Sequence, residues 1–463
     1  MNHQEFLKAA DKISHWLVDY YKNIEQYPVK SPLTINEIKN QLPALPPDCG
    51  CDFETIFNDF KEILVPGITH WQHPNFLAFF PSGASYPSIL AEFLSAGLGI
   101  QCMMWETSPA ATELEELTCN WLKTMLALPS EWQACIQDTA STSILTVLIA
   151  AREKLISANS PSNHNTDLKK MCVYLTTENN SSSEKSAKIA GFQAENIIKL
   201  TVNSLGNLEP QTLINQIESD LKKGLLPFAI IANYGSTGVL GIDPIDQIGK
   251  ICQKYGLWLH VDAAYLGAAL ILPECQQPLS YWEHVDSFNF NPHKWLLVNF
   301  DCSILWFKNP AFLLQAFAVS PIYLKAKSNQ SIHDYRNWSI QLGRRFRALK
   351  LWFVIRSYGV KGLQDIFRKQ FELTQIFYQE FRNQPLVDFL KPAEYNMIVF
   401  RFLQAQQKDN DSINAFNEYI AETTNGEGKY YITKTIFEGK IWIRLVFGNI
   451  HLEKKHIEAC IDY

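Results

Sequence analysis

The stretch "SFNFNPHKWLLVNFDC", residues 287–302, places His293 and Lys294 between two apolar runs that are typical of buried β-strands. An amine buried without a partner destabilises a fold by several kcal/mol, so proteins pair such a group, shift its pKa or use it. Alternatively, the lysine stem can lie along a strand while its head group reaches water. This stretch alone does not separate a structural Lys294 from a functional one, and the rest of the sequence has to decide.

The composition describes a chain with enough apolar material for a large core, since 47% of its 463 residues are hydrophobic. Single cores stop growing near ~250–300 residues, so we expect a soluble globular chain with one large domain and smaller additions. The net charge is −6 and basic residues do not cluster, which argues against nucleic acid or an anionic membrane surface as a partner. No apolar run approaches the ~20 residues that a membrane span requires.

Ten cysteines are dispersed along the chain, a pattern typical of reduced thiols in the cytoplasm rather than of a disulfide framework. The start, "MNHQEFLKAADK", lacks the basic and apolar regions of a signal peptide, which also favours a cytoplasmic location. The pair in "CGC", residues 49–51, has no second pair and no histidine cluster beside it. We therefore expect no metal site.

The first predicted helix spans "QEFLKAADKISHWLVDYYKNI", residues 4–24, and is amphipathic. Its apolar residues recur at helical spacing along one stripe, namely Phe6, Ala9, Ile13, Leu17 and Tyr20. Such a stripe is unusual on the surface of a monomer. We expect it to be covered either by a partner subunit or by the large domain of the same chain.

From residue 86 onward, helical patterns alternate with short apolar runs, which predicts an α/β domain with a mostly parallel sheet. The expected strands are "MCVYLTT" (171–177), "PFAIIANYG" (227–235), "GLWLHVDAA" (256–264), "SFNFNP" (287–292) and "CSILWFK" (302–308). A long helical pattern after Arg347 leads into a small α+β part, whose strands are "NMIVFRFL" (396–403) and "IWIRLVFG" (441–448).

Asp262 ends one of these apolar strands, and ligands of open α/β sheets collect at this end of the strands. An Asp at such a position is ordinarily a loop-start or helix-capping residue. Lys294, however, follows at the end of another predicted strand, about one strand–helix–strand step later. A lysine that forms a Schiff base and a carboxylate that keeps the pyridine nitrogen protonated are the two groups that pyridoxal phosphate requires. The pairing of Asp262 with Lys294 therefore favours a functional lysine.

Several stretches distributed over nearly the whole chain carry a family resemblance: "HPNFLAFFPSGASYPS" (73–88), "SPAATELE" (108–115), "IQDTAST" (136–142), "HVDAAY" (260–265), "NFNPHKWLLVNFDCS" (289–303), "DYRNW" (334–338) and "LGRRFRALKLWFVIRSYGVKGLQ" (342–364). They resemble the group II pyridoxal-phosphate decarboxylases, in particular the aromatic-L-amino-acid decarboxylases. The resemblance implies fold type I of the pyridoxal-phosphate enzymes, an aromatic amino-acid substrate and a homodimer with active sites at the subunit interface. We expect three parts: an N-terminal helical segment on the partner subunit (1–85), the cofactor-binding α/β domain (86–365) and a small α+β domain (366–463).

By this resemblance, Lys294 is the Schiff-base lysine, Asp262 is the partner of the pyridine nitrogen, and Ala264 packs on a face of the ring. The phosphate is expected at the start of the helix that follows "QDTASTS", where hydroxyls and backbone N–H groups offer an anion site. The further cofactor residues that the resemblance implies are Thr139, Ala140, Ser141, Asn180, Thr237, Asn291 and His293.

The resemblance also implies a set of substrate-binding residues: Trp71, Phe80, Pro81, Ser82, Met103 and Gly343. Ser82 matches the position that holds the substrate carboxylate. Gly343 matches a position where glycine accompanies indole- or catechol-type substrates. Met103 lies in "QCMMW" (101–105), which departs from the more apolar version in animal enzymes, so the preferred side chain stays open.

Two positions bear on the product. Tyr323 matches a loop tyrosine that protonates the α-carbon after carbon dioxide leaves, which favours an amine. Asn180 stands where the family usually has a histidine that stacks on the cofactor ring. Insect relatives with asparagine at this position resemble aldehyde synthases. Those enzymes release an aldehyde, ammonia and peroxide. An asparagine amide can hydrogen-bond but cannot stack as an aromatic ring or transfer protons near neutral pH. We expect an amine-forming decarboxylase, with an aldehyde synthase as the alternative and a weakly active cofactor binder as a third interpretation.

Overall fold

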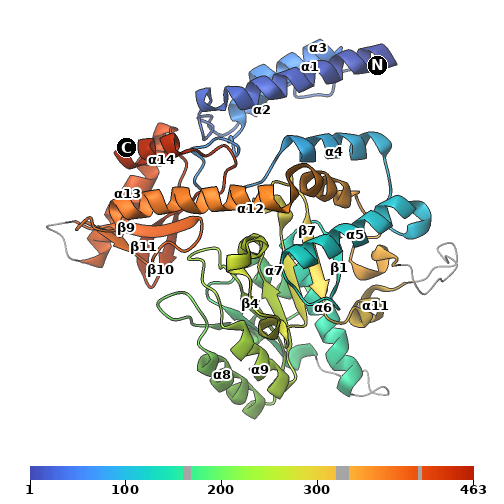
Figure 1. The fold of residues 1–463 in the computed structure, drawn as a ribbon, viewed down its shortest axis with the longest axis vertical. Helices are drawn as coiled ribbons and strands as arrows, with labels where there is room; N and C mark the ends of the chain where they lie inside the picture. The colour runs from blue at the N-terminus through green and yellow to red at the C-terminus, as the bar shows by residue number, and fades with distance from the viewer. Residues whose placement is uncertain (160–167, 320–332, 405–408) are drawn as a thin grey trace. The chain divides into compact units, whose positions relative to one another are not determined.

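The computed structural model describes residues 1–159, 168–319, 333–404 and 409–463. They form two compact units, whose elements are labelled in Figure 1. The large unit is Ser82–Lys369, and the small unit combines Met1–Pro81 with Gln370–Tyr463. Residues 1–81 therefore share a unit with the C-terminal part of the chain. Their expected packing on a partner subunit stays a prediction.

The large unit is built on one seven-stranded sheet, whose strands lie in the order β1-β7-β6-β5-β4-β2-β3. The strands are β1 (Gln133–Gln137), β2 (Met171–Thr176), β3 (Ile197–Leu200), β4 (Leu226–Asn233), β5 (Trp258–Asp262), β6 (Ser287–Phe290) and β7 (Ser303–Phe307). All residues of β2, β5, β6 and β7 are buried, as is typical of strands that are covered on both faces. This burial explains the nearly continuous apolar runs of β2 and β7, whereas β5 and β6 alternate apolar residues with buried polar ones.

The direction of β7 decides which strand ends lie together. Strands β6, β5, β4, β2 and β3 are parallel, whereas β7 is antiparallel both to β6 and to β1. Two reversals return the chain to its first direction, so β1 points the same way as β6. Six of the seven strands therefore end at one edge of the sheet, and β7 ends at the other. Strands β1, β4 and β7 are labelled in Figure 1.

Helices follow most of these strands along the chain. They are α4 (Tyr86–Leu98), α5 (Pro109–Met125), α6 (Ala140–Asn159), α7 (Ser181–Ile189), α8 (Pro210–Lys222), α9 (Ile245–Tyr255), α10 (Pro292–Trp295) and α11 (Ala311–Phe317). Helix α6 contacts β1, β4, β5, β6 and β7, so it crosses most of the sheet. Its residues Ile144, Val147 and Leu148 are fully buried in the core of this unit. Helix α12 (Arg347–Phe381) begins in the large unit and continues into the small one.

The small unit contains a four-stranded antiparallel sheet in the order β10-β11-β9-β8. Its strands are β8 (Val387–Phe389), β9 (Met397–Phe402), β10 (Thr433–Phe437) and β11 (Lys440–Val446), and its longer helices are α1 (His3–Lys22), α13 (Asn410–Glu427) and α14 (Lys454–Asp462). Helix α1 starts with a capping box between Asn2 and Glu5. Of the predicted apolar stripe on α1 only Ala9 is buried, whereas Phe6 and Ile13 are exposed.

The predicted fold class, an α/β domain with a mostly parallel sheet, is confirmed. Four strands were missed because they are short and carry polar residues, namely β1 and β3 of the large sheet and β8 and β10 of the small one. The apolar run after Lys294 was predicted as a strand and is not one: Lys294 lies in the single turn α10, and the next strand starts only at Ser303. In the part of the chain that the structure describes, no helix has the length and apolar character needed to cross a membrane.

Candidate active site

The predicted cofactor residues lie at the carboxyl ends of five strands, β1, β2, β4, β5 and β6. Residues 139–141 follow β1, Asn180 follows β2, and Thr237 follows β4. Asp262 ends β5, and Lys294 lies four residues after the end of β6. Since these strands end at the same edge of the sheet, the topology gathers residues that are far apart in the sequence.

Asp262 is almost completely buried, and only one of its two carboxylate oxygens is held by the protein. Its Oδ1 accepts hydrogen bonds from the backbone N–H of Ala264 (3.0 Å) and from Nδ2 of Asn289 (3.2 Å). Within the described residues, Oδ2 accepts no hydrogen bond. Oδ2 is not fully buried, so a donor that a ligand supplies can reach it. Asp262 is therefore prepared for a donor that comes from outside the chain.

Sequence reasoning missed two residues that support Asp262, namely Asn289 and His260. His260 lies two residues before Asp262 on β5, and its Nε2 is 2.7 Å from Oδ1 of Asn289. Burial lowers the pKa of His260 to about 4, so this imidazole is neutral at neutral pH. The signal was present in the alternating polar residues of "WLHVD" and "SFNFN", because alternate residues of a strand share one face.

Lys294 lies in α10, which begins right after β6. Its backbone N–H donates to the carbonyl of Asn291 (3.0 Å), which closes the turn. The next residue, Trp295, stacks on Tyr265 with ring centroids 5.1 Å apart, and Tyr265 belongs to the loop after Asp262. The backbone N–H of Asn291 also donates to the carbonyl of Ala264 (3.0 Å). These contacts hold the Asp262 loop against the turn that carries Lys294, whose side chain is partly exposed.

Gly83 brings the neighbouring Ser82 to the same turn. The backbone N–H of Gly83 donates to the carbonyl of His293 (2.9 Å). A Cβ atom at Gly83 would lie 3.1 Å from Cα of Leu297 and 3.2 Å from the carbonyl oxygen of Lys294, and neither backbone atom can give way easily. Glycine therefore permits this close approach. The structure thus brings the predicted carboxylate-binding Ser82 next to the Lys294 turn.

His293 and Asn291 are both buried beside Lys294. Nδ1 of His293 accepts the backbone N–H of Cys302 (2.9 Å), and burial, together with the charge of Lys294, lowers its pKa to about 3. Its single proton is therefore on Nε2 at neutral pH. Oδ1 of Asn291 has no hydrogen-bond partner in the described part of the chain. His293 and Asn291 thus leave a donor and an acceptor for further contacts.

The predicted phosphate residues Thr139, Ala140 and Ser141 form the beginning of α6. The first N–H groups of a helix have no acceptor within the helix, and together with the helix dipole they favour an anion. The carbonyl of Ser141 accepts a hydrogen bond from the hydroxyl of Ser186 (2.9 Å), which ties this end of α6 to α7. The N–H groups at the start of α6 therefore suit an anion at the same sheet edge, although that of Thr139 already donates to the carboxylate of Asp138 (2.6 Å).

Asn180 is the N-cap of α7, and both ends of its amide are engaged. Its Oδ1 accepts the backbone N–H of Ser182 (3.0 Å), and its Nδ2 donates to the hydroxyl of Thr237 (3.1 Å). Two predicted cofactor residues are thus in direct contact. The side chain of Asn180 is fixed by this double engagement rather than being free to rotate.

The predicted substrate residues are divided between the two units. Met103 and Gly343 belong to the large unit, as does Ser82, and a Cβ at Gly343 would lie 3.5 Å from the side chain of Gln101. The small unit holds Trp71, Phe80 and Pro81. There, the guanidinium of Arg444 lies over the ring of Phe80, 4.6 Å from its centroid. Tyr323 lies outside the described residues.

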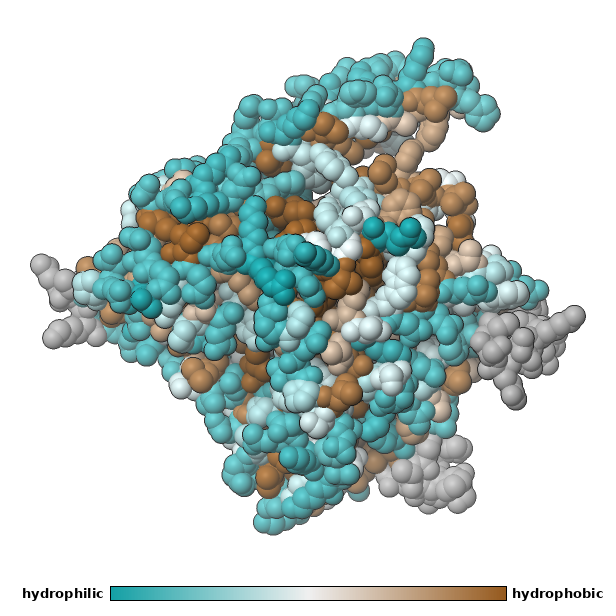
Figure 2. All heavy atoms as spheres, in the orientation of Figure 1, coloured by the Kyte–Doolittle hydropathy of each residue, from teal (hydrophilic) through white to brown (hydrophobic). Residues whose placement is uncertain are grey.

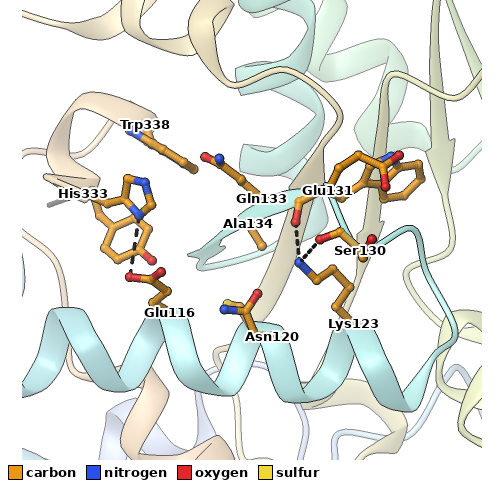
Figure 3. A pocket seen from close by; sticks show the side chains of 12 residues that line it. Glu116, Asn120, Lys123, Ser130, Glu131, Gln133, Ala134, His333 and Trp338 are labelled. Atoms are coloured by element: carbon orange, nitrogen blue, oxygen red, sulfur yellow. Dashed lines mark hydrogen bonds and ion pairs between the residues drawn. The ribbon is translucent and has the colours of Figure 1, made fainter. Parts of the chain in front are cut away.

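A separate pocket of about 220 Å³ lies between α5, β1 and residues 333–338 (Figure 3). In it, Nδ1 of His333 is 3.7 Å from a carboxylate oxygen of Glu116, and Nζ of Lys123 donates to the carbonyls of Ser130 (2.6 Å) and Trp132 (2.8 Å). The ammonium of Lys123 is thus already occupied by backbone oxygens. None of the residues that line this pocket is a predicted site residue, so it is distinct from the sheet-edge site.

The sheet-edge residues fit pyridoxal phosphate. A carboxylate oxygen of Asp262 without a donor suits a protonated ring nitrogen, and the start of α6 suits a phosphate. Lys294 adds a partly exposed amine beside the Asp262 loop. Among the described residues, no cluster of histidine, cysteine and acidic side chains could hold a metal ion.

Comparisons with known proteins agree with this fit. The "Pyridoxal-dependent decarboxylase conserved domain" matches residues 36–403. The chain is 38% identical to "Phenylacetaldehyde synthase" of Arabidopsis thaliana, over 99% of this chain and 94% of the relative. It is 36% identical to "Tryptophan decarboxylase 2" of Oryza sativa subsp. japonica, over 99% and 93%.

Solved structures give the same result. A crystal structure described as Oryza sativa TDC with PLP and tryptamine superposes with a TM-score of 0.96 at 29% identity and covers 100% of this chain and 97% of the other. That of Rhodiola rosea 4-hydroxyphenylacetaldehyde synthase superposes with a TM-score of 0.92 at 32% identity and covers 99% and 97%. Decarboxylases and aldehyde synthases thus both share this fold with the chain.

Proposed function

The chain belongs to the pyridoxal-dependent decarboxylases, carboxy-lyases that use pyridoxal phosphate, and from this premise we propose that it converts an aromatic L-amino acid to the corresponding amine and carbon dioxide. Relatives named as tryptophan and tyrosine decarboxylases support the substrate class. A single structural observation carries the proposal: Asp262, Lys294 and the start of α6 are gathered at one sheet edge, with one oxygen of Asp262 left open.

Each of these groups has a defined task in the proposed reaction. When bound, pyridoxal phosphate supplies an electron sink for the electron pair that the departing carboxylate leaves behind. Asp262 would hold a proton at the ring nitrogen through Oδ2, and the first N–H groups of α6 would bind the phosphate. Lys294 would hold the cofactor covalently. Ser82, placed at the Lys294 turn by Gly83, would bind the carboxylate that is lost.

Asn180 favours a second candidate, an aldehyde synthase. Its amide is held by Ser182 and Thr237, so it fixes the start of α7 but supplies neither an aromatic face nor a titrating proton. Relatives named as aldehyde synthases are as similar to the chain as the decarboxylases are. We keep amine formation as the main proposal because Tyr323 is retained as the expected proton donor.

The experiment that separates these candidates measures carbon dioxide, amine and peroxide together. Purified protein is given a panel of aromatic L-amino acids under air. We expect carbon dioxide with a matching amount of amine and a small amount of peroxide. Peroxide equal to carbon dioxide would replace the main proposal by the aldehyde synthase. Cofactor binding without carbon dioxide from any substrate would leave only a cofactor-binding protein.

A cytoplasmic homodimer is the proposed state of the protein. Helix α4 exposes Leu90, Phe93, Leu94 and Leu98 by 47–63%, and brown apolar atoms are visible around its position in Figure 2. Contiguous apolar patches of this kind mark interaction sites. All ten cysteines are free thiols, which suits a reducing compartment. Light scattering at micromolar concentration should give twice the mass of the chain, and an active monomer would contradict the dimer.

A further inference from the structure

A row of polar side chains crosses β5 and β6 behind Asp262, wholly inside the large unit. It consists of Trp258 and His260 on β5 and of Ser287 and Asn289 on β6. Alternate residues of a strand point to the same face, and the register pairs His260 with Ser287 and Asp262 with Asn289. All four side chains are at most 2% exposed, so water does not contribute to their hydrogen bonds.

The four side chains are joined end to end by hydrogen bonds. The indole Nε1 of Trp258 donates to the hydroxyl oxygen of Ser287 (2.8 Å), which lies 2.9 Å from Nδ1 of His260. Nε2 of His260 is 2.7 Å from Oδ1 of Asn289. Nδ2 of Asn289 in turn donates to Oδ1 of Asp262 (3.2 Å). The row therefore ends on the carboxylate that the proposed function assigns to the pyridine nitrogen.

The direction of every hydrogen bond in this row is fixed by chemistry. A carboxylate oxygen and an amide oxygen only accept, so Nδ2 of Asn289 donates to Asp262 and Oδ1 of Asn289 accepts from Nε2 of His260. This leaves the hydroxyl of Ser287 to donate to the unprotonated Nδ1 of His260. Burial lowers the pKa of His260 to about 4, so the ring carries a single proton at neutral pH, and that proton is on Nε2. Nε2–H therefore donates to the amide oxygen of Asn289, which turns the amide nitrogen toward Asp262. All donors point the same way, toward the carboxylate.

We propose that His260 and Asn289 are positioning residues, which hold Oδ1 of Asp262 so that Oδ2 faces the pyridine nitrogen. The inference rests on the proposed function, because it assigns these residues a task toward the cofactor. Two donors on Oδ1, from Asn289 and Ala264, prevent the carboxylate from rotating. Asp262 is also the charged group that acts on His260.

The alternative is that the row only stabilises the pairing of β5 with β6. The two interpretations differ in what changes when one hydrogen-bonding side chain of the row is removed. A structural row would change the stability of the fold and nothing at the cofactor. A positioning row would change the affinity for pyridoxal phosphate and the protonation of its ring nitrogen even in a well-folded variant.

The test uses three variants and a matched control. Asn289→Leu removes the donor to Asp262 at similar volume. His260→Leu removes the donor to Asn289, whereas His260→Gln retains an amide N–H that can reach Asn289. The control is Asn196→Leu, because Asn196 is also buried and donates a single hydrogen bond, to the carbonyl of Lys169, outside the row. Each protein is titrated with pyridoxal phosphate, and the NMR shift of an isotopically labelled ring nitrogen reports its protonation across pH.

We expect Asn289→Leu to bind the cofactor roughly 10- to 100-fold more weakly, since hydrogen bonds to charged groups contribute that much. The ring nitrogen should lose its proton at a lower pH than in the wild type. His260→Leu should change both readouts in the same direction by about tenfold or less, and His260→Gln should recover most of the loss. Asn196→Leu should leave both readouts unchanged, whatever it does to the thermal midpoint.

The inference is overturned if Asn289→Leu binds the cofactor and protonates its ring nitrogen as the wild type does. If His260→Gln and His260→Leu have the same cofactor affinity and the same ring-nitrogen protonation, the proposed direction of the hydrogen bonds in the row is wrong. Failure of the proposed function looks different, because it appears in the wild type, which would then release no carbon dioxide from any aromatic L-amino acid, whether or not it binds pyridoxal phosphate.

Discussion

Glu115 and Asp262 are both carboxylates buried in the large unit, with exposed fractions of 2% and 8%. Both oxygens of Glu115 are held by the chain: Oε1 accepts from the backbone N–H of Ile136 (2.8 Å) and from Nη2 of Arg344 (2.6 Å), and Oε2 accepts from Nη1 of Arg344 (3.0 Å). Asp262 is held through Oδ1 alone. The protein thus supplies donors to both oxygens of Glu115 but to only one oxygen of Asp262.

The difference separates two uses of a buried charge. Glu115 lies in "SPAATELE" and Arg344 in "LGRRFR", and their ion pair joins α5 to the segment before α12 and to β1. Both motifs resemble the family as clearly as the cofactor motifs do, yet this pair is complete without a ligand. Family resemblance therefore marks structural and functional residues alike, whereas the number of satisfied oxygens distinguishes them.

The largest effect should come from Asp262→Ala. Without the carboxylate, the charge that develops at the cofactor loses its partner, so turnover should fall by about 10³-fold or more. The free energy of unfolding should change little beyond ~1–2 kcal/mol, because only two hydrogen bonds are lost. Steady-state assays and urea titrations measure the two quantities. Near-normal turnover in this variant would remove Asp262 from the site.

Glu115→Ala should show the opposite pattern. It leaves the buried guanidinium of Arg344 without its charge partner, which should lower the free energy of unfolding by about 3–5 kcal/mol. Turnover per folded molecule at low temperature should stay within a small factor of the wild type. The double variant Glu115→Leu with Arg344→Met should recover much of the stability, because it buries no unpaired charge. If Glu115→Ala loses turnover without losing stability, the contrast between the two carboxylates fails.

The pH dependence of stability should also distinguish the cofactor site, through His293, from the ion pair of Glu115 with Arg344. Burial lowers the pKa of His293 to about 3 from its ordinary 6.5, so the folded state favours the neutral ring while the unfolded chain binds a proton more readily. This contribution to stability is complete above about pH 6.5 and is lost as pH falls, at up to ~1.4 kcal/mol per unit. His293→Asn keeps an acceptor for the N–H of Cys302 but does not titrate. Urea titrations of the cofactor-free protein between about pH 6 and pH 5 should therefore show a shallower slope in this variant.

The matching control for the pH series is Glu115→Gln. Burial by itself lowers the pKa of Arg344, but the charge and hydrogen bonds of Glu115 outweigh it and raise the pKa above its ordinary value, so Arg344 does not titrate in this range. The variant should lower stability at every pH and leave the slope as in the wild type. An unchanged slope in His293→Asn would show that His293 is not held neutral by the fold.

The smallest expected effect concerns Asn180, which has both a structural and a functional contact. Asn180→His should lower the peroxide fraction by about three- to tenfold, because ~1.4 kcal/mol between two barriers changes a product ratio tenfold. It should also cost about 1 kcal/mol or less through the altered cap of α7. Quantifying peroxide and amine from one reaction measures the first effect, and thermal unfolding measures the second. A peroxide fraction equal to that of the wild type would remove Asn180 from product control.

Periodicity and apolar runs predicted the fold class and most strands of the large sheet. For β2, β4 and β5 the predicted and observed strands agree closely, because these largely buried strands are rich in apolar residues. The long helical pattern after Arg347 was also predicted, but not its interruption at Gly359, where φ is 65°. Asp262 and Lys294 could be singled out because a charged residue at the end of an apolar run is unusual.

Other features depend on tertiary contacts that leave no local pattern. Strand β1 has only five residues, and its place beside β7 follows from the antiparallel pairing of segments far apart in the chain. The support of Asp262 by Asn289 requires the register of β5 against β6, which no single segment specifies. The contact between Asn180 and Thr237 likewise joins two loops that only the sheet brings together.

The reversed strand β7 has a consequence for the order of events during synthesis. In the part of the chain that the structure describes, residues 133–137 pair only with residues 303–307, so the turn after β1 cannot be fixed until the ribosome has made the chain well past β7. Pairings between such distant segments form slowly. A nascent chain that already carries Asp262 and Lys294 still lacks a fixed start of α6, where we propose that the phosphate binds. We therefore expect the cofactor to bind late in folding. Chains truncated before Ser303 should remain incomplete folding intermediates and should not form a smaller holoenzyme.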